Sequence, residues 1–379
     1  MRRNLTVLAV CLLAAVLFTG CGQQNKNNDE WLNKAAVDAV ETPGDLYEKA
    51  LEEDVLIVYT VTTRITQVKE AFENDYPGLS VEVRDLRSPN LVDAVENNYT
   101  AGGSDCDVVV CSDNSGDFKA RLVDTGIVVR YLPEDIGKHL KNNTRDDQVP
   151  SFINEAEMLF YDSGKYETCP ISNIWELTES KYSGRIYMPN PLRSFSTYTL
   201  CSSVFQPEAS EELEKAYGSY FGHEAEDGDV AAKLWTMIAA NTVFTNSSDE
   251  VVEALSNGKA DFGFLVSSKL RLKDIGMRIQ PVYKLVPFSG CRTSYSVTLA
   301  RNSKNINTAK LFIRYLYGEA DGKGKGYQPF ITPGTWSARD DVADGDMTAL
   351  EDIDLIIPDT DFIMKQKGME EFWTGLLEK

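Results

Sequence analysis

The run VLIVYT at residues 55–60 decides the fold, because it is an uninterrupted apolar strand between two helix-like segments. A helical start precedes it at residues 45–51, with Asp45 as the expected N-cap. After it come a helix-like run at 66–76, an alternating strand at 79–83, a helix at 91–99 and a strand at 107–111. This alternation predicts parallel βαβ units with right-handed crossovers.

A second α/β block follows a stretch at residues 117–148, where prolines and polar runs predict irregular connections. A strand at 157–161 opens the block. Its further predicted strands lie at 185–188, 260–266 and 294–300, and its predicted helices at 209–220, 230–240, 249–256, 308–317 and 373–379. The sequence therefore predicts two α/β lobes.

Composition narrows the function classes. The 379 residues suggest about two domains, and 42% hydrophobic with 25% charged residues are typical of an ordinary globular protein. The net charge of −20 disfavours binding to nucleic acid. Only two histidines, His139 and His223, leave little material for zinc sites or imidazole catalysis.

The amino terminus has the form of a secretory signal. Arg2 and Arg3 precede an apolar run at residues 5–18, which is too short to span a membrane. The segment LFTGC at residues 17–21 resembles a bacterial lipobox, in which Cys21 becomes the lipidated, palmitate-bearing first residue. A plain signal peptide cut elsewhere, or an uncleaved anchor, is the alternative. Either way we expect an extracytoplasmic protein.

Five cysteines remain beyond Cys21, and an odd number leaves at least one unpaired. Cys106 and Cys111 lie on one predicted strand, about 16 Å apart at ~3.3 Å per residue, which is too far for a disulfide. Buried free thiols are the favoured interpretation, although pairing among the others stays open. The remaining cysteines are Cys169, Cys201 and Cys291.

Several short motifs, taken in order, resemble one family. They are LYEKA (46–50) before LIVY (56–59), AFENDYPG (71–78), DCDVV (105–109), WELT (175–178), YSGRI (182–186), NGKADFG (257–263) and AKLFIRYL (309–316). Together, behind a lipobox, they resemble the extracellular solute-binding proteins of ABC importers. The resemblance covers most of the mature chain and is strongest to the branch that binds ferric ion, thiamine and phosphorylated compounds.

The resemblance implies a periplasmic binding protein-like fold, in which two α/β lobes joined by a hinge close over a ligand cleft. We expect a signal peptide at 1–20, a lipid-anchored tether at 21–44, lobe 1 at 45–150 with a return near 281–300, and lobe 2 at 151–280. Residues 301–379 would form helices and loops that pack across the lobes. The expected partners are a small-molecule ligand and a membrane permease, with the chain acting as a monomer anchored by lipid.

Ligands in open α/β sheets bind beyond the carboxyl ends of the strands, which singles out particular loops. Their hydroxyl, amide and guanidinium groups, together with helix N-termini, suit an anion. For any single residue the alternative is a helix-capping role. The predicted ligand-binding residues are Thr62, Thr63, Arg64, Ser112, Asp113, Asn114, Arg193, Ser194, Ser196, Thr197, Ser267 and Ser268.

Ser267 and Ser268 stand where ferric binders of this family typically carry adjacent tyrosines. Without phenolate oxygens the hard ligands that ferric ion prefers are missing. The favoured cargo is therefore a phosphorylated, phosphonate or other oxyanion compound, with ferric iron as the alternative. The identity of the cargo and of the permease, and the type of cell envelope, stay open.

No metal or cofactor is expected. Residues 340–351 match an EF-hand loop at several positions, but Val342 stands at the third, so a solvated acidic loop is favoured. The motifs G-x-S-x-G and H-E-x-x-H are both missing from the sequence. We therefore expect a binding protein; a secreted lipoprotein enzyme is less favoured, as is an adhesion protein, which would more often show repeats.

Overall fold

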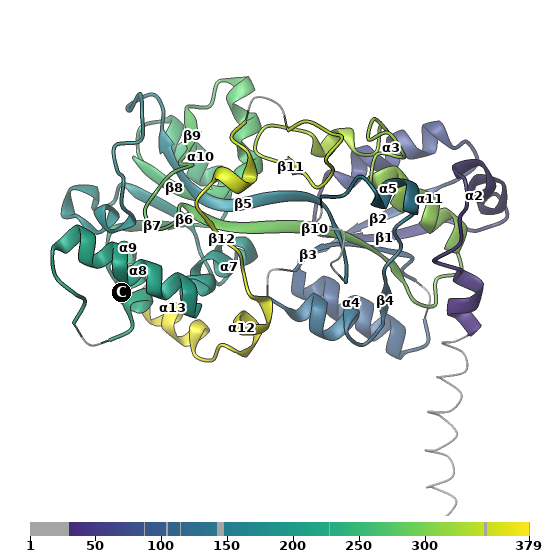
Figure 1. Ribbon diagram of the computed structural model, residues 1–379, viewed down its shortest axis with the longest axis horizontal. Coiled ribbons are helices and arrows are strands. Elements are labelled where there is room, and N and C mark those ends of the chain that lie inside the picture. The colour runs from purple at the N-terminus through teal and green to yellow at the C-terminus, as the bar shows by residue number, and fades with distance from the viewer. Residues whose placement is uncertain are drawn as a thin grey trace, which may run out of the picture.

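The computed structural model describes residues 30–86, 88–103, 105–113, 115–141, 148–226, 228–344 and 347–378. One mixed sheet runs through two lobes in the strand order β2-β1-β3-β10-β5-β8-β6-β7 (Figure 1). The predicted signal segment, Cys21 and Asn114 lie outside the described residues.

Lobe 1 contains the predicted parallel units. Strand β1 pairs in parallel with both β2 and β3, which confirms the βαβ interpretation. Val58 of β1 packs with the side of the sheet that α3 and α11 cover, while Tyr59 packs with α4 on the other side. The elements are α2 (Pro43–Ala50), β1 (Leu56–Thr60), α3 (Ile65–Asp75), β2 (Val81–Asp85), α4 (Ser88–Thr100) and β3 (Val108–Ser112).

Two long antiparallel strands join the lobes. β5 (Ser151–Asp162) and β10 (Gly290–Ala300) pair over most of their length and cross the centre of the molecule in Figure 1. Both strands are longer than predicted, because the polar residues of NEAE (154–157) interrupt the apolar pattern of β5 although all twelve residues of that strand are buried. Before β5 lie a π-helix, η1 (Phe118–Val123), β4 (Val128–Val129) and α5 (Glu134–Gly137).

Lobe 2 is built on β8, which pairs with β5, and on parallel β6 and β7. Helix α7 was not predicted, because six of its nine residues are buried and its polar side chains leave no amphipathic pattern. The elements are η2 (Ile174–Thr178), η3 (Ser180–Tyr182), β6 (Ile186–Pro189), α7 (Phe195–Ser203), α8 (Pro207–Phe221), α9 (Val230–Asn241), β7 (Thr242–Thr245), α10 (Ser248–Ser256), β8 (Phe262–Val266), η4 (Ser267–Ile275) and β9 (Ile279–Pro281).

The carboxyl-terminal segment contributes to both lobes. α11 (Ile306–Leu316) packs into the core of lobe 1, whereas Trp373 of α13 packs into the core of lobe 2. Short strands from the same segment pair with β5 and β10. The remaining elements are η5 (Gln328–Phe330), β11 (Trp336–Ser337), η6 (Leu350–Asp352), β12 (Leu355–Ile356), α12 (Thr360–Lys365) and α13 (Met369–Leu377).

The described part of the predicted tether packs against lobe 1. The Trp31 indole donates a hydrogen bond of 2.9 Å to the Ser303 carbonyl, and Ala35 is fully buried. The predicted N-cap of the next helix was wrong. Thr42 is the N-cap of α2, and Asp45 stands at position N3, where its side chain completes a capping box with Thr42. The sequence T-P-G-D fits both positions, and Pro43 at the first helical turn moves the cap to Thr42.

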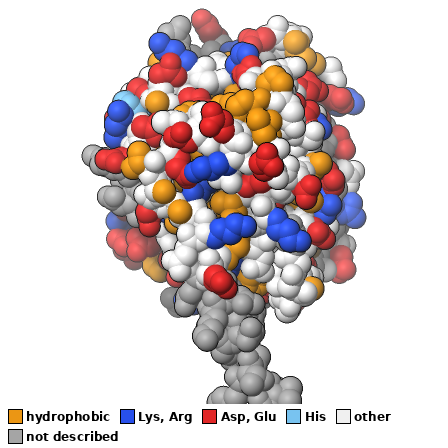
Figure 2. All heavy atoms as spheres, turned by 90° about the vertical axis from the view of Figure 1, so that its right-hand side faces the viewer, with side chains coloured by type: hydrophobic (Ala, Val, Ile, Leu, Met, Phe, Trp, Pro, Cys, Tyr) orange, Lys and Arg blue, Asp and Glu red, His pale blue; other side chains and the backbone are white. Residues whose placement is uncertain are grey.

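None of the five described cysteines forms a disulfide, and all but Cys169 are buried. Figure 2 shows the end of lobe 1, where acidic and basic side chains are interspersed. Within the described residues, the helices are all too short or too polar to cross a membrane.

Asp107 connects three segments of lobe 1. Its buried carboxylate accepts hydrogen bonds from the Ile57 N–H (2.8 Å), the Ser303 hydroxyl (2.7 Å) and the Asn305 amide (3.0 Å). Removing the carboxylate would leave these donors buried without partners.

We therefore expect Asp107→Ala to lower the free energy of unfolding by about 3 kcal/mol. Urea denaturation measures this loss. Asp85→Ala, which removes an exposed carboxylate from the edge strand β2, is the control and should stay within about 0.5 kcal/mol of the parent protein. Equal losses in both variants would contradict the role given to Asp107.

Candidate ligand-binding cleft

A cavity of about 880 Å³ lies where the two lobes face each other. Ser115 and Asp117 of the loop after β3 line it from lobe 1, and Ser194, Phe195 and Tyr198 line it from lobe 2. The rest of the lining is Pro191, Leu192, Ile363, Met364, Gln366, Lys367, Gly368, Met369, Glu370, Glu371 and Thr374. The loops after β3 and β6, both predicted to meet at a ligand, therefore share one cavity.

The loop after β3 is held by Asp113. Its carboxylate accepts hydrogen bonds from the backbone N–H groups of Gly116 (2.9 Å), Phe118 (3.3 Å) and Lys119 (3.0 Å). This is the capping role that the sequence left open for such residues. Ser112, at the end of β3, is buried.

Arg64, in the loop after β1, contacts the hinge strand β5. Thr62 is buried, and its N–H donates to the Thr60 hydroxyl (3.1 Å), whereas Thr63 is exposed. One guanidinium nitrogen of Arg64, Nη2, forms an ion pair with Glu155 of β5, and the guanidinium stacks 5.0 Å from the centre of the Phe330 ring. The other nitrogen, Nη1, is buried and has no hydrogen-bond partner in the described part of the chain.

The loop after β6 leads into α7. Arg193 is exposed, hydrogen-bonds to Asn246 (3.0 Å) and does not line the cavity. The Ser194 hydroxyl lies 2.9 Å from the Thr197 hydroxyl and 3.5 Å from that of Ser196. Ser194 is the N-cap of α7, but its side chain accepts no capping hydrogen bond.

The serines after β8 turn inward. The Ser267 hydroxyl donates to the Gly334 carbonyl (2.6 Å) and accepts from the Ala156 N–H (2.9 Å). Ser268 is buried, and its carbonyl accepts from Arg271. Neither serine lines the cavity between the lobes.

Glu157 is a candidate that sequence reasoning missed. Its side chain is fully buried in the middle of β5, where Oε1 accepts a hydrogen bond of 2.8 Å from Thr197 and Oε2 has no partner among the described residues. Burial raises the pKa of this carboxyl to about 7, although the Thr197 and Ser196 hydroxyls lower it. The signal in the sequence was the spacing of two acids within a strand, at positions 155 and 157.

Arg271 and Tyr295 complete the surroundings of the Arg64–Glu155 pair. Burial lowers the pKa of Arg271, and the charge of Arg64 lowers it further, whereas Glu155 raises it. Burial and the charge of Glu155 raise the pKa of Tyr295. Two arginines therefore act on one carboxylate at the hinge.

The carboxyl-terminal segment closes one side of the cavity. α12 lies beneath the gap between the two lobes in Figure 1, and Asp361 at its start is 3.6 Å from Lys119 of lobe 1. Gly116 contacts the same turn so closely that an added Cβ would lie 2.4 Å from the Thr360 carbonyl oxygen. The segment thus touches both walls of the cavity.

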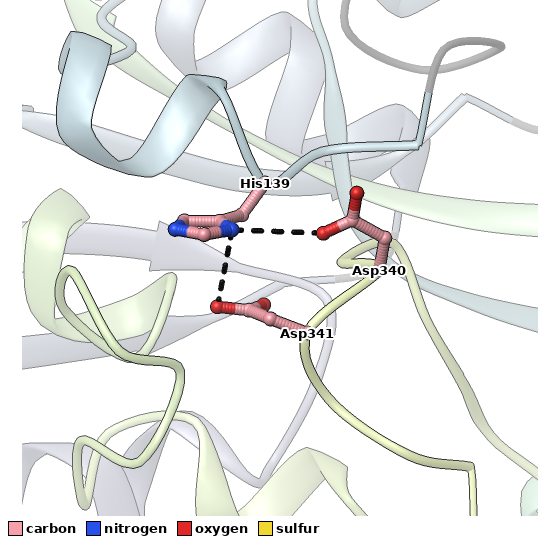
Figure 3. A group of neighbouring side chains, drawn as sticks. All are labelled: His139, Asp340 and Asp341. Carbon is pink, nitrogen blue, oxygen red and sulfur yellow. Dashed lines mark ion pairs between the residues drawn. The ribbon is translucent and has the colours of Figure 1, made fainter.

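One group of side chains in the described ranges could hold a metal ion, and it lies away from the cavity. His139 Nδ1 is 3.6 Å from Asp340 and 3.5 Å from Asp341 (Figure 3). Asp341 already accepts two hydrogen bonds from the buried Arg339, at 2.8 and 2.7 Å, so a cation would compete with that guanidinium. Asp344 of the EF-hand-like stretch accepts from the Ser337 N–H.

The close approach at Gly116 makes a testable prediction. Gly116→Ala should destabilise the protein through its positive φ of 86°, at about 1–2 kcal/mol, and in addition through the contact with Thr360. Gly102→Ala is the matched control, since Gly102 also has a positive φ (72°) but no atom within 4 Å of an added Cβ. Thermal unfolding of both variants measures the difference in stability. Equal losses of stability would mean that α12 moves away from the added Cβ without cost.

Glu157 gives a prediction about stability and pH. Because its folded pKa of about 7 lies above the reference value of 4.5, its contribution to stability is full below pH 4.5 and is lost as pH rises towards 7. Glu157→Gln should therefore flatten the decline in the free energy of unfolding between pH 5 and pH 7. Denaturation at several pH values checks this, and an unchanged slope in the variant would contradict it.

Comparisons with known proteins agree with this architecture. The family described as bacterial extracellular solute-binding protein matches residues 55–322. A search of curated proteins found no match.

Solved structures share the fold at low sequence identity. Iron-bound HitA from Pseudomonas aeruginosa is 15% identical, with a TM-score of 0.65 over 86% of this chain and 99% of that chain. AfuA from Actinobacillus pleuropneumoniae, with bound fructose-6-phosphate, is 14% identical, with a TM-score of 0.63 over 86% and 98%. Trichodesmium IdiA (FutA), in complex with iron and citrate, is 14% identical, with a TM-score of 0.56 over 86% and 98%.

The predicted two-lobed fold and the predicted family are both confirmed. Members of this family bind solutes outside the cytoplasm and are not enzymes. Since the match covers well over half of its residues, the chain belongs to the bacterial extracellular solute-binding proteins.

Proposed function

We propose that this chain is the receptor of an ABC importer, which captures a small oxyanion solute between its lobes and delivers it to a membrane permease. Phosphorylated and phosphonate compounds are the favoured cargo. The observation that carries the receptor role is the cavity of about 880 Å³ lined by loops from both lobes. A solute in that position would be enclosed when the lobes close.

The donors at the cleft favour an anion. Ser194 and Phe195, at the start of α7, line the cavity, and the capping hydrogen bond that Ser194 could supply is not made. The first N–H groups of a helix attract negative charge. Nη1 of Arg64 is a further donor, close to Arg271 and without a partner among the described residues, although Arg64 is not one of the residues that line the cavity.

Acidic side chains set a limit on this attraction. Asp117, Glu370 and Glu371 also line the cavity, against one lysine, Lys367. An anion would therefore bind where fixed donors concentrate, at the start of α7, rather than in the average field of the cavity.

Ferric iron is the second candidate, since HitA and IdiA were solved with iron. Tyr198 lines the cavity, but positions 267 and 268 carry serines that do not line it, and the Ser267 hydroxyl donates to the Gly334 carbonyl. A ferric site here would need a different set of hard oxygen ligands.

The lipid anchor at Cys21 belongs to this proposal. A receptor outside the cytoplasm stays near its permease when a lipid on Cys21 holds it at the membrane.

A binding screen of the mature protein tests the function. Thermal unfolding is measured with phosphorylated, phosphonate and carboxylate metabolites and with ferric citrate. A ligand at a hundred times its dissociation constant should add about 2.7 kcal/mol to stability. Stabilisation by one oxyanion class supports the proposal, stabilisation by iron alone favours the second candidate, and a flat screen refutes the proposed cargo.

Arg64→Lys tests the guanidinium. Lysine keeps the charge next to Glu155 but loses the second donor, so affinity for the ligand from the screen should fall by about 1.5 kcal/mol, close to tenfold. Arg84→Lys is the matched control, because Arg84 also pairs with a glutamate, Glu82, and stacks on a ring, that of Tyr59, but lies on the edge strand β2 rather than beside β5. Equal effects on affinity would contradict a direct role of Arg64.

A further inference from the structure

A chain of hydrogen bonds joins the cavity to the buried carboxyl of Glu157. Ser194 lines the cavity, its hydroxyl is 2.9 Å from that of Thr197, and Thr197 is 2.8 Å from Glu157 Oε1. Ser194 is the N-cap of α7, Thr197 lies in its first turn, and Glu157 lies on the hinge strand β5. The chain therefore leads from the expected position of the ligand to a carboxyl that solvent does not reach.

Each hydroxyl has one proton, so, with both hydrogen bonds kept and the proton of neutral Glu157 on Oε1, the protonation state of Glu157 sets the direction of the Ser194–Thr197–Glu157 chain. When Glu157 is ionised, Thr197 donates to it, Ser194 donates to Thr197, and Ser194 can only accept from a ligand. When Glu157 carries a proton on Oε1, it donates to Thr197, Thr197 donates to Ser194, and Ser194 donates into the cavity. An oxyanion accepts hydrogen bonds and donates none, so it fits only the second arrangement.

We propose that Glu157 determines the specificity of the cleft through proton linkage: an oxyanion binds at the first turn of α7 while Glu157 takes up one proton from solvent. This inference rests on the proposed anion-binding function and adds the residue that controls it. Repulsion between the bound anion and the Glu157 carboxylate also favours proton uptake, since an anion near a buried carboxylate favours the neutral acid.

The groups around Glu157 allow this linkage. Glu155 faces it from the same strand, Cys201 from α7, and Cys291 and Tyr295 from β10, while the residue opposite on β8 is Val266. The three groups other than Glu155 are neutral in this pH range, because burial raises the pKa of each. No cation is among them, and burial already raises the pKa of the Glu157 carboxyl to about 7.

The test uses the mature protein with sulfate as the probe, because sulfate does not itself titrate between pH 5.5 and pH 8.5. Calorimetry in two buffers that differ in ionisation enthalpy gives the number of protons bound per sulfate. The proposal expects uptake of up to one proton, and affinity that falls about tenfold per pH unit above pH 7.

Three variants separate the relay from general electrostatics. Glu157→Gln should bind sulfate with no proton uptake and no pH dependence, because its amide donates to Thr197 at every pH. Ser194→Ala should weaken binding and remove the pH dependence. Glu370→Gln, which removes an exposed carboxylate from the cavity lining, should retain the pH dependence.

The outcomes are distinguishable. Sulfate binding without proton uptake, or pH dependence that survives in Glu157→Gln, overturns the linkage and leaves the receptor function standing. If neither sulfate nor any oxyanion of the screen binds, the proposed cargo fails and the linkage fails with it. Thermal unfolding of each variant without ligand confirms that it is folded.

Discussion

The antiparallel pairing of β5 with β10 is the constraint on which the rest of the structure depends. β10 continues on its other edge into the parallel strands of lobe 1 through β3, and β5 continues into those of lobe 2 through β8. Ile153 of β5 belongs to the core of lobe 1, and Leu159 of the same strand to the core of lobe 2. A slip of one residue would exchange the faces of the pair and disrupt both cores at once.

This constraint explains why charged groups lie at the centre of the molecule. Glu155 and Glu157 are two apart on β5 and so point to the same side of the strand. Glu155 binds Arg64 of lobe 1, and Glu157 binds Thr197 of lobe 2. One face of a single strand therefore contacts a predicted ligand loop of each lobe.

The sequence predicts the fold well where apolar side chains set the pattern. Residues 55–60 and 107–111 are apolar because parallel strands are covered on both faces, and both were placed correctly to within one residue. β5 was predicted at less than half its length because its middle carries polar residues whose burial depends on partners far away in the chain, such as Arg64 and Thr197. α7 was missed for the same reason, since tertiary contacts stabilise it rather than an amphipathic pattern.

In the candidate site, too, some features could be predicted from the sequence and others could not. Strand order and the rule of carboxyl ends predicted which loops meet, and the loops after β3 and β6 do share a cavity. The rule cannot predict which way a side chain turns within a loop. Ser267 satisfies a carbonyl and an N–H inside the fold, while Asp113 holds its own loop. These orientations depend on backbone groups left without partners nearby, which the sequence does not reveal.

The fold itself leaves the cargo undecided, because HitA and AfuA, which both share the fold of this chain, were solved with iron and with fructose-6-phosphate. Cargo specificity therefore depends on the few polar groups at the hinge. In our proposal Glu157 separates anions from ferric ion by whether binding takes up or releases a proton. An anion stabilises the protonated carboxyl, so its binding takes up a proton. A ferric ion would stabilise the carboxylate, so its binding would release one. The direction of proton movement therefore reports the charge of the cargo.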